Sequence, residues 1–195
     1  MSISLIGALW RVWGWIKWPL MALLVLFIAL CVYYLYVGSQ VVKTREAVAK
    51  IHANHLVWDD VFGSLPPEPD PAADSATLAG IDANNNGIRD DVERAIYSAH
   101  KNSAKVAAAE FQYAKELQME FTDVFNSDTL VAVLQEEDRG YQCIRSGGGQ
   151  TEVENLIFNT QVRKDAREKI YSDYMRGFAL PNSDYCDLDP ASLPN

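Results

Sequence analysis

Oxygen-bearing side chains alternate along a twelve-residue stretch of the chain, Asp82–Glu93. They stand at positions 1, 3, 5, 9 and 12, as Asp82, Asn84, Asn86, Asp90 and Glu93. A calcium ion takes about six to eight oxygen ligands, and a loop of this pattern supplies them because alternate residues point inward. Gly87 at position 6 permits the sharp turn, and the backbone carbonyl of Ile88 adds a ligand. The stretch therefore predicts a calcium site.

A turn without metal is the alternative interpretation of the same residues. The run of three asparagines before Gly87 is turn chemistry in its own right. Asp90, with Glu93 three residues later, is also a capping arrangement for a following helix. Both interpretations explain Asp90 and Glu93. Only a metal explains why oxygen-bearing residues alternate ahead of the glycine.

The stretch D-A-N-N-N-G-I-R-D-D-V-E resembles the thrombospondin type 3-like calcium repeat, D-x-[DN]-x-[DN]-G-[ILV]-x-D-x-x-E. It is less similar to an EF-hand loop, because position 8 is Arg89 and not an aliphatic residue. Such repeats usually come in tandem arrays, whereas this chain has one copy, which covers 12 of 195 residues. The resemblance implies side-chain ligation by the five residues named above and carbonyl ligation by Ile88.

The charge of the loop limits how tightly it can hold an ion. Positions 3 and 5 are asparagine, so Asp82, Asp90 and Glu93 carry all the formal negative charge among the predicted ligands. Fewer charges mean weaker binding, and we expect a dissociation constant of about 10⁻⁴–10⁻³ M, as in extracellular modules. Such an ion is expected to be structural and not a switch.

Catalytic groups are hard to find in this chain. His52 and His55 are three residues apart, a spacing that can bind zinc on a helix, but no third ligand lies near them in sequence. We expect two surface histidines, with a zinc hydrolase as the alternative. Helical carboxylates such as Glu110, Glu116 and Glu120 have the spacing of solvated helix faces. The sequence predicts that the protein is not an enzyme.

Three cysteines bear on the cellular compartment. Cys31 lies within an apolar run, where it is expected to be a small hydrophobe. Cys143 and Cys186 are the only others, and in an oxidising compartment they would pair. Chain-entropy arithmetic gives such a bridge roughly 4 kcal/mol. Two unrelated thiols are the alternative.

An apolar segment near the N-terminus predicts a membrane anchor. Residues 18–37 contain no charged side chain, and a helix of that length spans roughly 30 Å, the thickness of the bilayer core. Residues 1–17 are amphipathic and rich in tryptophan, which favours the headgroup region. Two alternatives compete with the anchor. One is a cleavable signal that ends near Val37-Gly38-Ser39, and the other is a lipid attached to Cys31, which Leu30 disfavours because a small residue is expected at that position. We expect an uncleaved single-pass anchor in the inner (cell) membrane.

Charge counting leaves the orientation open. Arg11 and Lys17 precede the apolar run, and Lys43, Arg45 and Lys50 follow it, which gives almost no positive-inside bias. A disulfide persists outside the cytosol, and a weak calcium site fills only where calcium is near millimolar. We therefore expect residues 38–195 on the periplasmic or extracytoplasmic side.

Helical periodicity predicts an all-α protein. We expect a juxtamembrane helix over 38–63, a stiff Pro-rich linker over 64–80 and a helical domain over 81–195. Within the domain one long helix should run from Val92 to about Phe125, and another should start at Ser127 and end near Gly140. Thr151-Glu-Val-Glu154 predicts a capping box, and Thr160 a restart that ends at Gly177.

The net charge of -9 narrows the range of partners, since the acidic excess lies beyond residue 37. An acidic surface argues against nucleic acid as a partner. We expect a membrane-tethered binding or scaffold protein that meets a protein partner. An immunity or inhibitor protein acting on a toxic partner is a narrower alternative.

Overall fold

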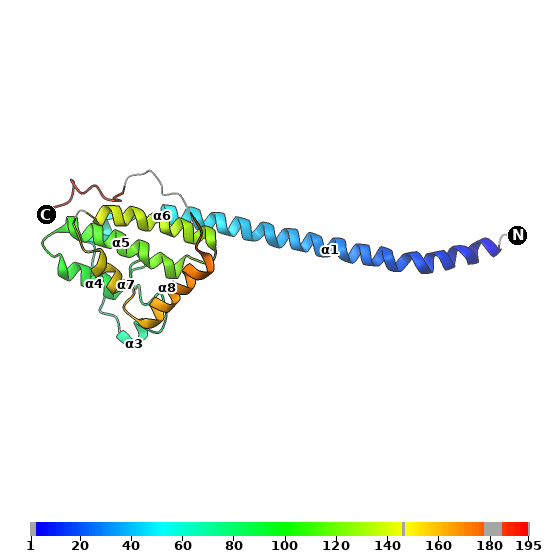
Figure 1. Cartoon of the computed structure of the whole chain (residues 1–195), viewed down its shortest axis with the longest axis horizontal. Coiled ribbons are helices and arrows are strands. Elements are labelled where there is room, and N and C mark those ends of the chain that lie inside the picture. The colour runs from blue at the N-terminus through cyan, green and yellow to red at the C-terminus, as the bar shows by residue number, and fades with distance from the viewer. Residues whose placement is uncertain (1–2, 146, 178–184, 195) are drawn as a thin grey trace. The chain divides into compact units, whose positions relative to one another are not determined.

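The computed structural model describes residues 3–145, 147–177 and 185–194, with side chains from residue 15 onward. These residues form α-helices and, within the described ranges, no strand, so the predicted all-α class is confirmed. Figure 1 gives the order of the elements. The chain divides into two compact units, Met1–Arg45 and Glu46–Asn195, which are described separately.

Most of helix α1, Ile3–Ala53, lies in the first unit. From Trp15 onward this helix is long and apolar enough to cross a membrane, a property that a signal sequence near the N-terminus shares. Its large apolar side chains, such as Leu24, Phe27 and Tyr34, are exposed, which suits contact with lipid. The side chains of residues 1–14, which include most of the predicted amphipathic segment 1–17, lie outside the described part of the chain.

The predicted boundary between anchor and juxtamembrane helix is absent, because α1 continues through residues 37 and 38 to Ala53. Gly38 is the only helix-weakening residue at that point, and one glycine costs about 1 kcal/mol. The helix ends instead before α2, Trp58–Phe62, where the Asp60 side chain accepts a hydrogen bond from Val57 N. The predicted helix over 38–63 is therefore two helices.

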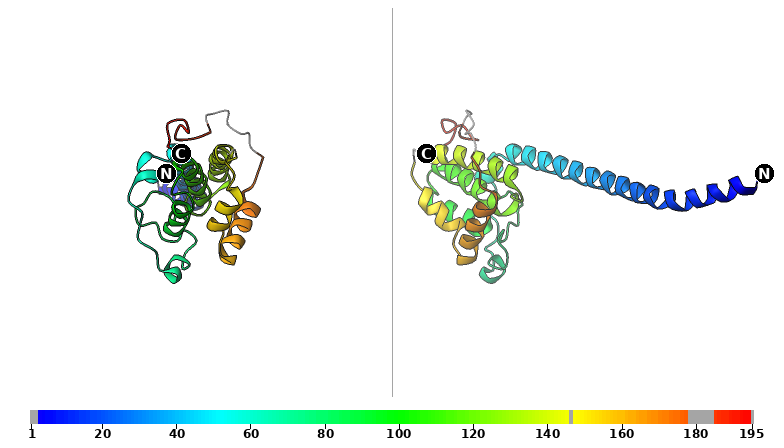
Figure 2. Two further views of the ribbon diagram at one scale, coloured as in Figure 1. Left: turned by 90° about the vertical axis from the view of Figure 1, so that its left-hand side faces the viewer. Right: turned by 45° about the vertical axis from the view of Figure 1, so that its right-hand side comes forward.

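Helix α5, Ala104–Thr122, lies at the centre of the second unit. It packs against α2, α4, α6, α7 and α8, and α6 runs beside it (Figures 1 and 2). The bounds of the surrounding helices are α3, Pro71–Asp74; α4, Asp90–Ala99; α6, Ser127–Ile144; α7, Gln150–Ile157; and α8, Gln161–Tyr174.

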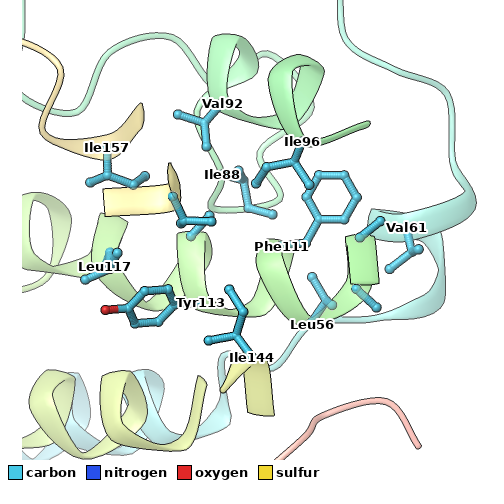
Figure 3. Close-up of a cluster of buried hydrophobic side chains, with 14 of the residues drawn as sticks. Leu56, Val61, Ile88, Val92, Ile96, Phe111, Tyr113, Leu117, Ile144 and Ile157 are labelled. Carbon is cyan, nitrogen blue, oxygen red and sulfur yellow. The ribbon is translucent and has the colours of Figure 1, made fainter. Parts of the chain in front are cut away.

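Two apolar clusters hold this unit together. In the larger cluster Phe111 of α5 faces Ile96 of α4, with Leu56 and Ile144 on other sides (Figure 3). In the smaller one Ile51, in the last turns of α1, packs with Met119 of α5 and Val133 of α6. The C-terminal end of α1 is thus part of the domain core.

The expected long helix from Val92 to Phe125 is wrong, since it is interrupted between Ala99 and Ala104. The break falls at the polar run His100–Ser103, where the Ser103 side chain accepts a hydrogen bond from Val106 N and caps α5. The apolar spacing continues across the break, so periodicity alone could not reveal it.

Other predicted helix ends meet mixed outcomes. Thr160 caps α8 through Arg163 N, as expected, although α8 ends at Tyr174 and not at Gly177. Asn126, and not Ser127, caps α6, and Gly140 lies inside that helix. Helix α7 begins after Gly149, whose backbone has a left-handed conformation. The capping box predicted at Thr151 is wrong, because no side chain caps this helix.

The Pro-rich segment 64–80 is folded against the domain and is not a free spacer. Asp74 is buried and pairs with two buried arginines, Arg89 and Arg163. The Arg163 guanidinium also donates to the carbonyls of Asp74 and Leu78. The predicted stiff, extended linker is wrong for part of the segment, because Pro71 begins helix α3 and Asp70 caps it. The partners that hold the segment come from residues distant in sequence.

Candidate functional site

The predicted calcium loop is a tight turn organised by its first residue. The Asp82 carboxylate accepts hydrogen bonds from Asn86 N at 3.2 Å and Gly87 N at 2.9 Å. Gly87 has a φ of 88° and Asn85 a φ of 56°, left-handed values that glycine and asparagine adopt most readily. The residue types at the turn therefore match the backbone that they have to form.

The last predicted ligand folds back onto the third and fifth. The Glu93 carboxylate lies 3.2 Å from the amide nitrogen of Asn84 and 3.2 Å from that of Asn86. Burial raises the pKa of the Glu93 carboxyl to about 7, although both amide hydrogen bonds lower it. Two asparagines of the first half of the loop thus bind Glu93 through their amide nitrogens.

Asp90 has an unsatisfied oxygen in the same region. Its Oδ1 accepts from Ala83 N at 2.9 Å, while its Oδ2 is buried and has no hydrogen-bond partner among the described residues. Burial raises the pKa of Asp90, and the neighbouring Asp82 raises it further. An orphaned carboxylate oxygen costs roughly 1–3 kcal/mol or more, so a buried one calls for an explanation.

The predicted capping role of Asp90 is wrong, because the N-cap of α4 is Arg89 and its side chain makes no cap hydrogen bond. The Arg89 side chain is fully buried and points elsewhere. Its guanidinium pairs with Asp91 and Asp74 and donates to the carbonyls of Leu156 and Ile157 in α7. The residue that departs from the EF-hand pattern therefore fastens the loop to the domain.

The burial of Ile88 explains why position 7 of the loop is aliphatic. Its side chain is completely buried in the larger apolar cluster, beside Val92 and Phe111 (Figure 3). With Ile88 and Arg89 both buried, the second half of the loop is held rigidly against α4 and α5. The first half, Asp82–Asn86, is half-buried or exposed and open to solvent.

The donor set of the loop fits a hard cation better than it fits zinc or iron. In the described part of the chain, no three His, Cys, Asp or Glu side chains form a group that could hold a metal. This holds for the loop as well, so Asp82, Asp90 and Glu93 do not form such a group in this structure. By composition the loop offers three carboxylates, two amide oxygens and a backbone carbonyl, which are the oxygen ligands of Ca²⁺. The orphaned Asp90 Oδ2 and the buried Glu93 carboxylate are the groups that a cation would satisfy.

The two histidines do not form a zinc site within the described residues. His52 Nδ1 lies 2.5 Å from Glu136 Oε1, and His55 Nδ1 lies 2.9 Å from Asp187 Oδ1. Each ring pairs with a different carboxylate, and both rings are partly exposed. Their partners come from α6 and from the C-terminal tail, so the histidines join separate segments of the fold.

The cysteine pair fastens the C-terminal tail. The Sγ atoms of Cys143 and Cys186 lie 2.01 Å apart, a disulfide, as the sequence predicts for an oxidising compartment. Next to it, Asp187 accepts hydrogen bonds from Leu56 N at 2.7 Å and Arg139 Nη2 at 2.7 Å. The tail therefore lies against both α6 and the segment that follows α1. An apolar cavity of about 240 Å³ lies beside the disulfide.

Carboxylates expected on solvated faces are buried instead. Glu110, Glu116 and Glu120 are each at most 5% exposed, because α5 is covered on nearly every side. Glu137 of α6 is buried as well. Their helical spacing did not reveal this burial, because it depends on how α2, α4, α6, α7 and α8 pack around α5 and not on the sequence of α5 itself. The one local signal is that α5 has no continuous polar face: its polar residues alternate with apolar ones all round the helix.

Comparison with known proteins does not add a family to these observations. A scan against protein-family models and searches of curated proteins and of solved structures found no match to this chain.

Proposed function

We propose that this protein is a membrane-anchored, extracytoplasmic helical domain that is ordered by one structural calcium ion in the loop Asp82–Glu93 and that serves as a binding or scaffold module. The ion is held by the side chains of Asp82, Asn84, Asn86, Asp90 and Glu93 and by the carbonyl of Ile88. The chemistry that calcium would supply here is charge neutralisation among the three carboxylates of the loop.

One observation carries the calcium assignment. The buried Asp90 Oδ2 has no hydrogen-bond partner in the described structure, and it belongs to position 9 of the loop. Asp82 and Asp74 lie near enough to raise the pKa of Asp90 by repulsion, so three acidic groups and Glu93 share a small region. A divalent cation relieves both the repulsion and the orphaned oxygen.

The position of the loop supports a structural role. Its last four residues form the first turn of α4, and Asp90 N donates to Ile81 O at 2.8 Å, closing the loop on itself. Arg89 then links the loop to Asp74 in the Pro-rich segment and to α7. An ion here stiffens the point at which three segments of the domain meet.

The extracytoplasmic placement rests on the disulfide and on the expected affinity. A disulfide between Cys143 and Cys186 persists in an oxidising compartment, and a site with three charged ligands needs calcium near millimolar. The N-terminal helix supplies the attachment to the membrane. The acidic surface suits a basic region of a protein partner.

The direct test is thermal unfolding of the full chain in detergent micelles, with EGTA, with about 5 mM calcium, or with the same concentration of magnesium. A dissociation constant of about 10⁻⁴–10⁻³ M gives roughly 1–2 kcal/mol of stabilisation, or a rise in Tm of about 2–8 °C. We expect the rise with calcium alone, and its loss in Asp82→Ala.

Asp59→Ala is the matched control, because Asp59 is an exposed acid on α2 outside the loop. It should keep the calcium response of the unmodified chain. A Tm that does not respond to calcium up to several millimolar would refute the site and leave a turn stabilised by its own hydrogen bonds.

A further inference from the structure

Three buried carboxyl groups lie together where α5, α6 and α8 meet. Glu116 and Glu120 are one turn apart on α5, and Glu137 comes from α6. The exposed fractions are 2%, 0% and 8%, respectively. Burying even one ionised carboxylate costs several kcal/mol unless it is paired, so a group of three needs a source of compensation.

Only one of the three has a cation bonded to it in the described structure. Arg167 of α8 donates to both oxygens of Glu120, at 3.0 and 3.1 Å, and Tyr171 donates to Glu120 at 3.2 Å. Glu137 lies near enough to Glu120 for their charges to repel, and its Oε1 is buried without a hydrogen-bond partner among the described residues. A buried carboxyl group in that position is more stable protonated than ionised.

Glu116 accepts a hydrogen bond from an amide, and the charge of Arg139 also lowers its pKa. Gln112 donates to its Oε1 at 2.9 Å, whereas Oε2 is buried without a hydrogen-bond partner in the described residues. That oxygen lies against Gly140 in α6, at a place where any side chain would overlap it. The glycine inside α6 is thereby explained: it makes room for a carboxyl group and not for solvent.

Arg139 is the other cation in the region. It bonds Glu136 at 2.5 Å and Asp187 at 2.7 Å, so its charge is already opposed by two carboxylates. Charged and titratable groups face the cluster from every side; these are Tyr113 on α5, Glu136 and Arg139 on α6, Arg167 and Tyr171 on α8, and Asp187 in the tail.

We propose that Glu116 and Glu137 each hold a proton in the folded domain and form a proton-operated latch that keeps α8 and α6 closed on α5 in acid and loosens them as the medium becomes alkaline. The ligand of this site is the proton itself. The latch is separate from the calcium loop and does not depend on it.

The sign of the pH dependence follows from burial. Burial raises the pKa of both Glu116 and Glu137 well above the ordinary glutamate value. A raised pKa in the folded state means that the stabilisation is complete below the unfolded pKa and is lost as pH rises through the folded value. Glu116 and Glu137 therefore stabilise the domain most in acid, and their contribution is lost as the pH rises, opposite to that of the carboxylates in ion pairs.

Helix α8 is the element expected to move first. Its only fully buried side chain is Arg163, near its start, while its second half is held by Arg167 and Tyr171 at Glu120 and by Arg167 over the ring of Phe158. Ionised Glu137 beside Glu120 adds a second negative charge to a site with one bonded arginine. The repulsion weakens the contact among the three helices.

The test is thermal unfolding of the full chain in detergent micelles across pH 5–9, with EGTA present so that calcium binding does not contribute. Glu93, whose pKa is about 7, adds the same pH dependence to every chain, so the comparison is between each variant and the unmodified chain. Glu137→Gln and Glu116→Gln keep the shape of the protonated side chains. We expect the Tm of the unmodified chain to fall as pH rises, and each variant to show a flatter profile with a higher Tm at the alkaline end. Glu168→Gln, an exposed glutamate on α8, should follow the unmodified chain.

Infrared spectroscopy of the unmodified chain gives an independent readout that survives poor folding of a variant. At neutral pH we expect the carbonyl stretch of protonated carboxyl groups, reduced in Glu137→Gln, and faster hydrogen exchange in α8 at alkaline pH. The proposal is overturned if the spectrum of the unmodified chain at neutral pH lacks that band. It is also overturned if Glu137→Gln has a lower Tm than the unmodified chain at pH 9.

Discussion

Side chains of the loop Asp82–Glu93 suit the backbone that they form, and the carboxylates of Asp82 and Asp90 repel each other. Asp82 organises the turn by accepting two backbone hydrogen bonds, while Asp90 and Glu93 are buried beside it. Backbone donors satisfy Asp82 but leave Asp90 Oδ2 orphaned. The turn could be predicted from the sequence, because a twelve-residue loop is a local structure.

Adding a negative charge at position 5 of the loop should destabilise the calcium-free form and stabilise the calcium-bound form. Asn86→Asp places a carboxylate next to Glu93, which Asn86 now contacts through its amide nitrogen. We expect a lower Tm in EGTA because of repulsion, and calcium binding tighter by on the order of tenfold because a charged ligand replaces an amide. Calorimetric titration with calcium, alongside melting in EGTA, measures both effects.

An unchanged affinity together with a lower Tm would show that residue 86 does not face the ion. Asn85→Asp is a suitable control, since Asn85 stands between ligand positions and is exposed. It should leave the calcium affinity close to that of the unmodified chain.

At the scale of elements, helix α8 and the Pro-rich segment depend on one buried arginine. Arg163 donates to the carbonyls of Asp74 and Leu78 and pairs with the Asp74 carboxylate at 3.1 Å. Helical periodicity placed α8 and its Thr160 cap correctly, because both are local signals. The partner segment lies more than eighty residues earlier, beyond the reach of any local pattern.

Arg163→Ala should detach this segment from α8. Removing one partner of a buried pair destabilises by about 3–5 kcal/mol, because the other partner stays buried without compensation; here Arg89 still opposes Asp74, so we expect the lower end. Urea unfolding of the full chain in micelles measures the loss, with Lys164→Ala, an exposed neighbour, as control. Equal stability of both variants would contradict the role of Arg163 in holding segment 64–80 against α8.

For the whole molecule, the tail is the element that ties distant segments together. The disulfide joins it to α6, and Asp187 joins it to Leu56 N and Arg139. Residues that follow α1 in sequence are thereby held by residues near the C-terminus. The pairing of two cysteines could be inferred by elimination, whereas the role of Asp187 could not.

Loss of the disulfide should loosen this connection. We expect Cys143→Ser combined with Cys186→Ser to lower the free energy of unfolding by about 2–4 kcal/mol and to expose the tail to proteases. Limited proteolysis and urea unfolding measure these effects, and thiol labelling of native membranes tests whether the pair is oxidised in the cell. Free thiols there would contradict the extracytoplasmic placement.

The sequence by itself predicted the helical class, the apolar N-terminal span and the pairing of the two domain cysteines, all of which the structure shows; calcium binding by the loop stays a prediction. Each of these depends on neighbouring residues or on simple counting. Tertiary structure decided that Glu116, Glu120 and Glu137 are buried, that segment 64–80 is packed and that α4 and α5 are separate helices. Burial of a polar side chain is set by how the helices pack on one another, and the spacing of residues within one helix does not carry that information.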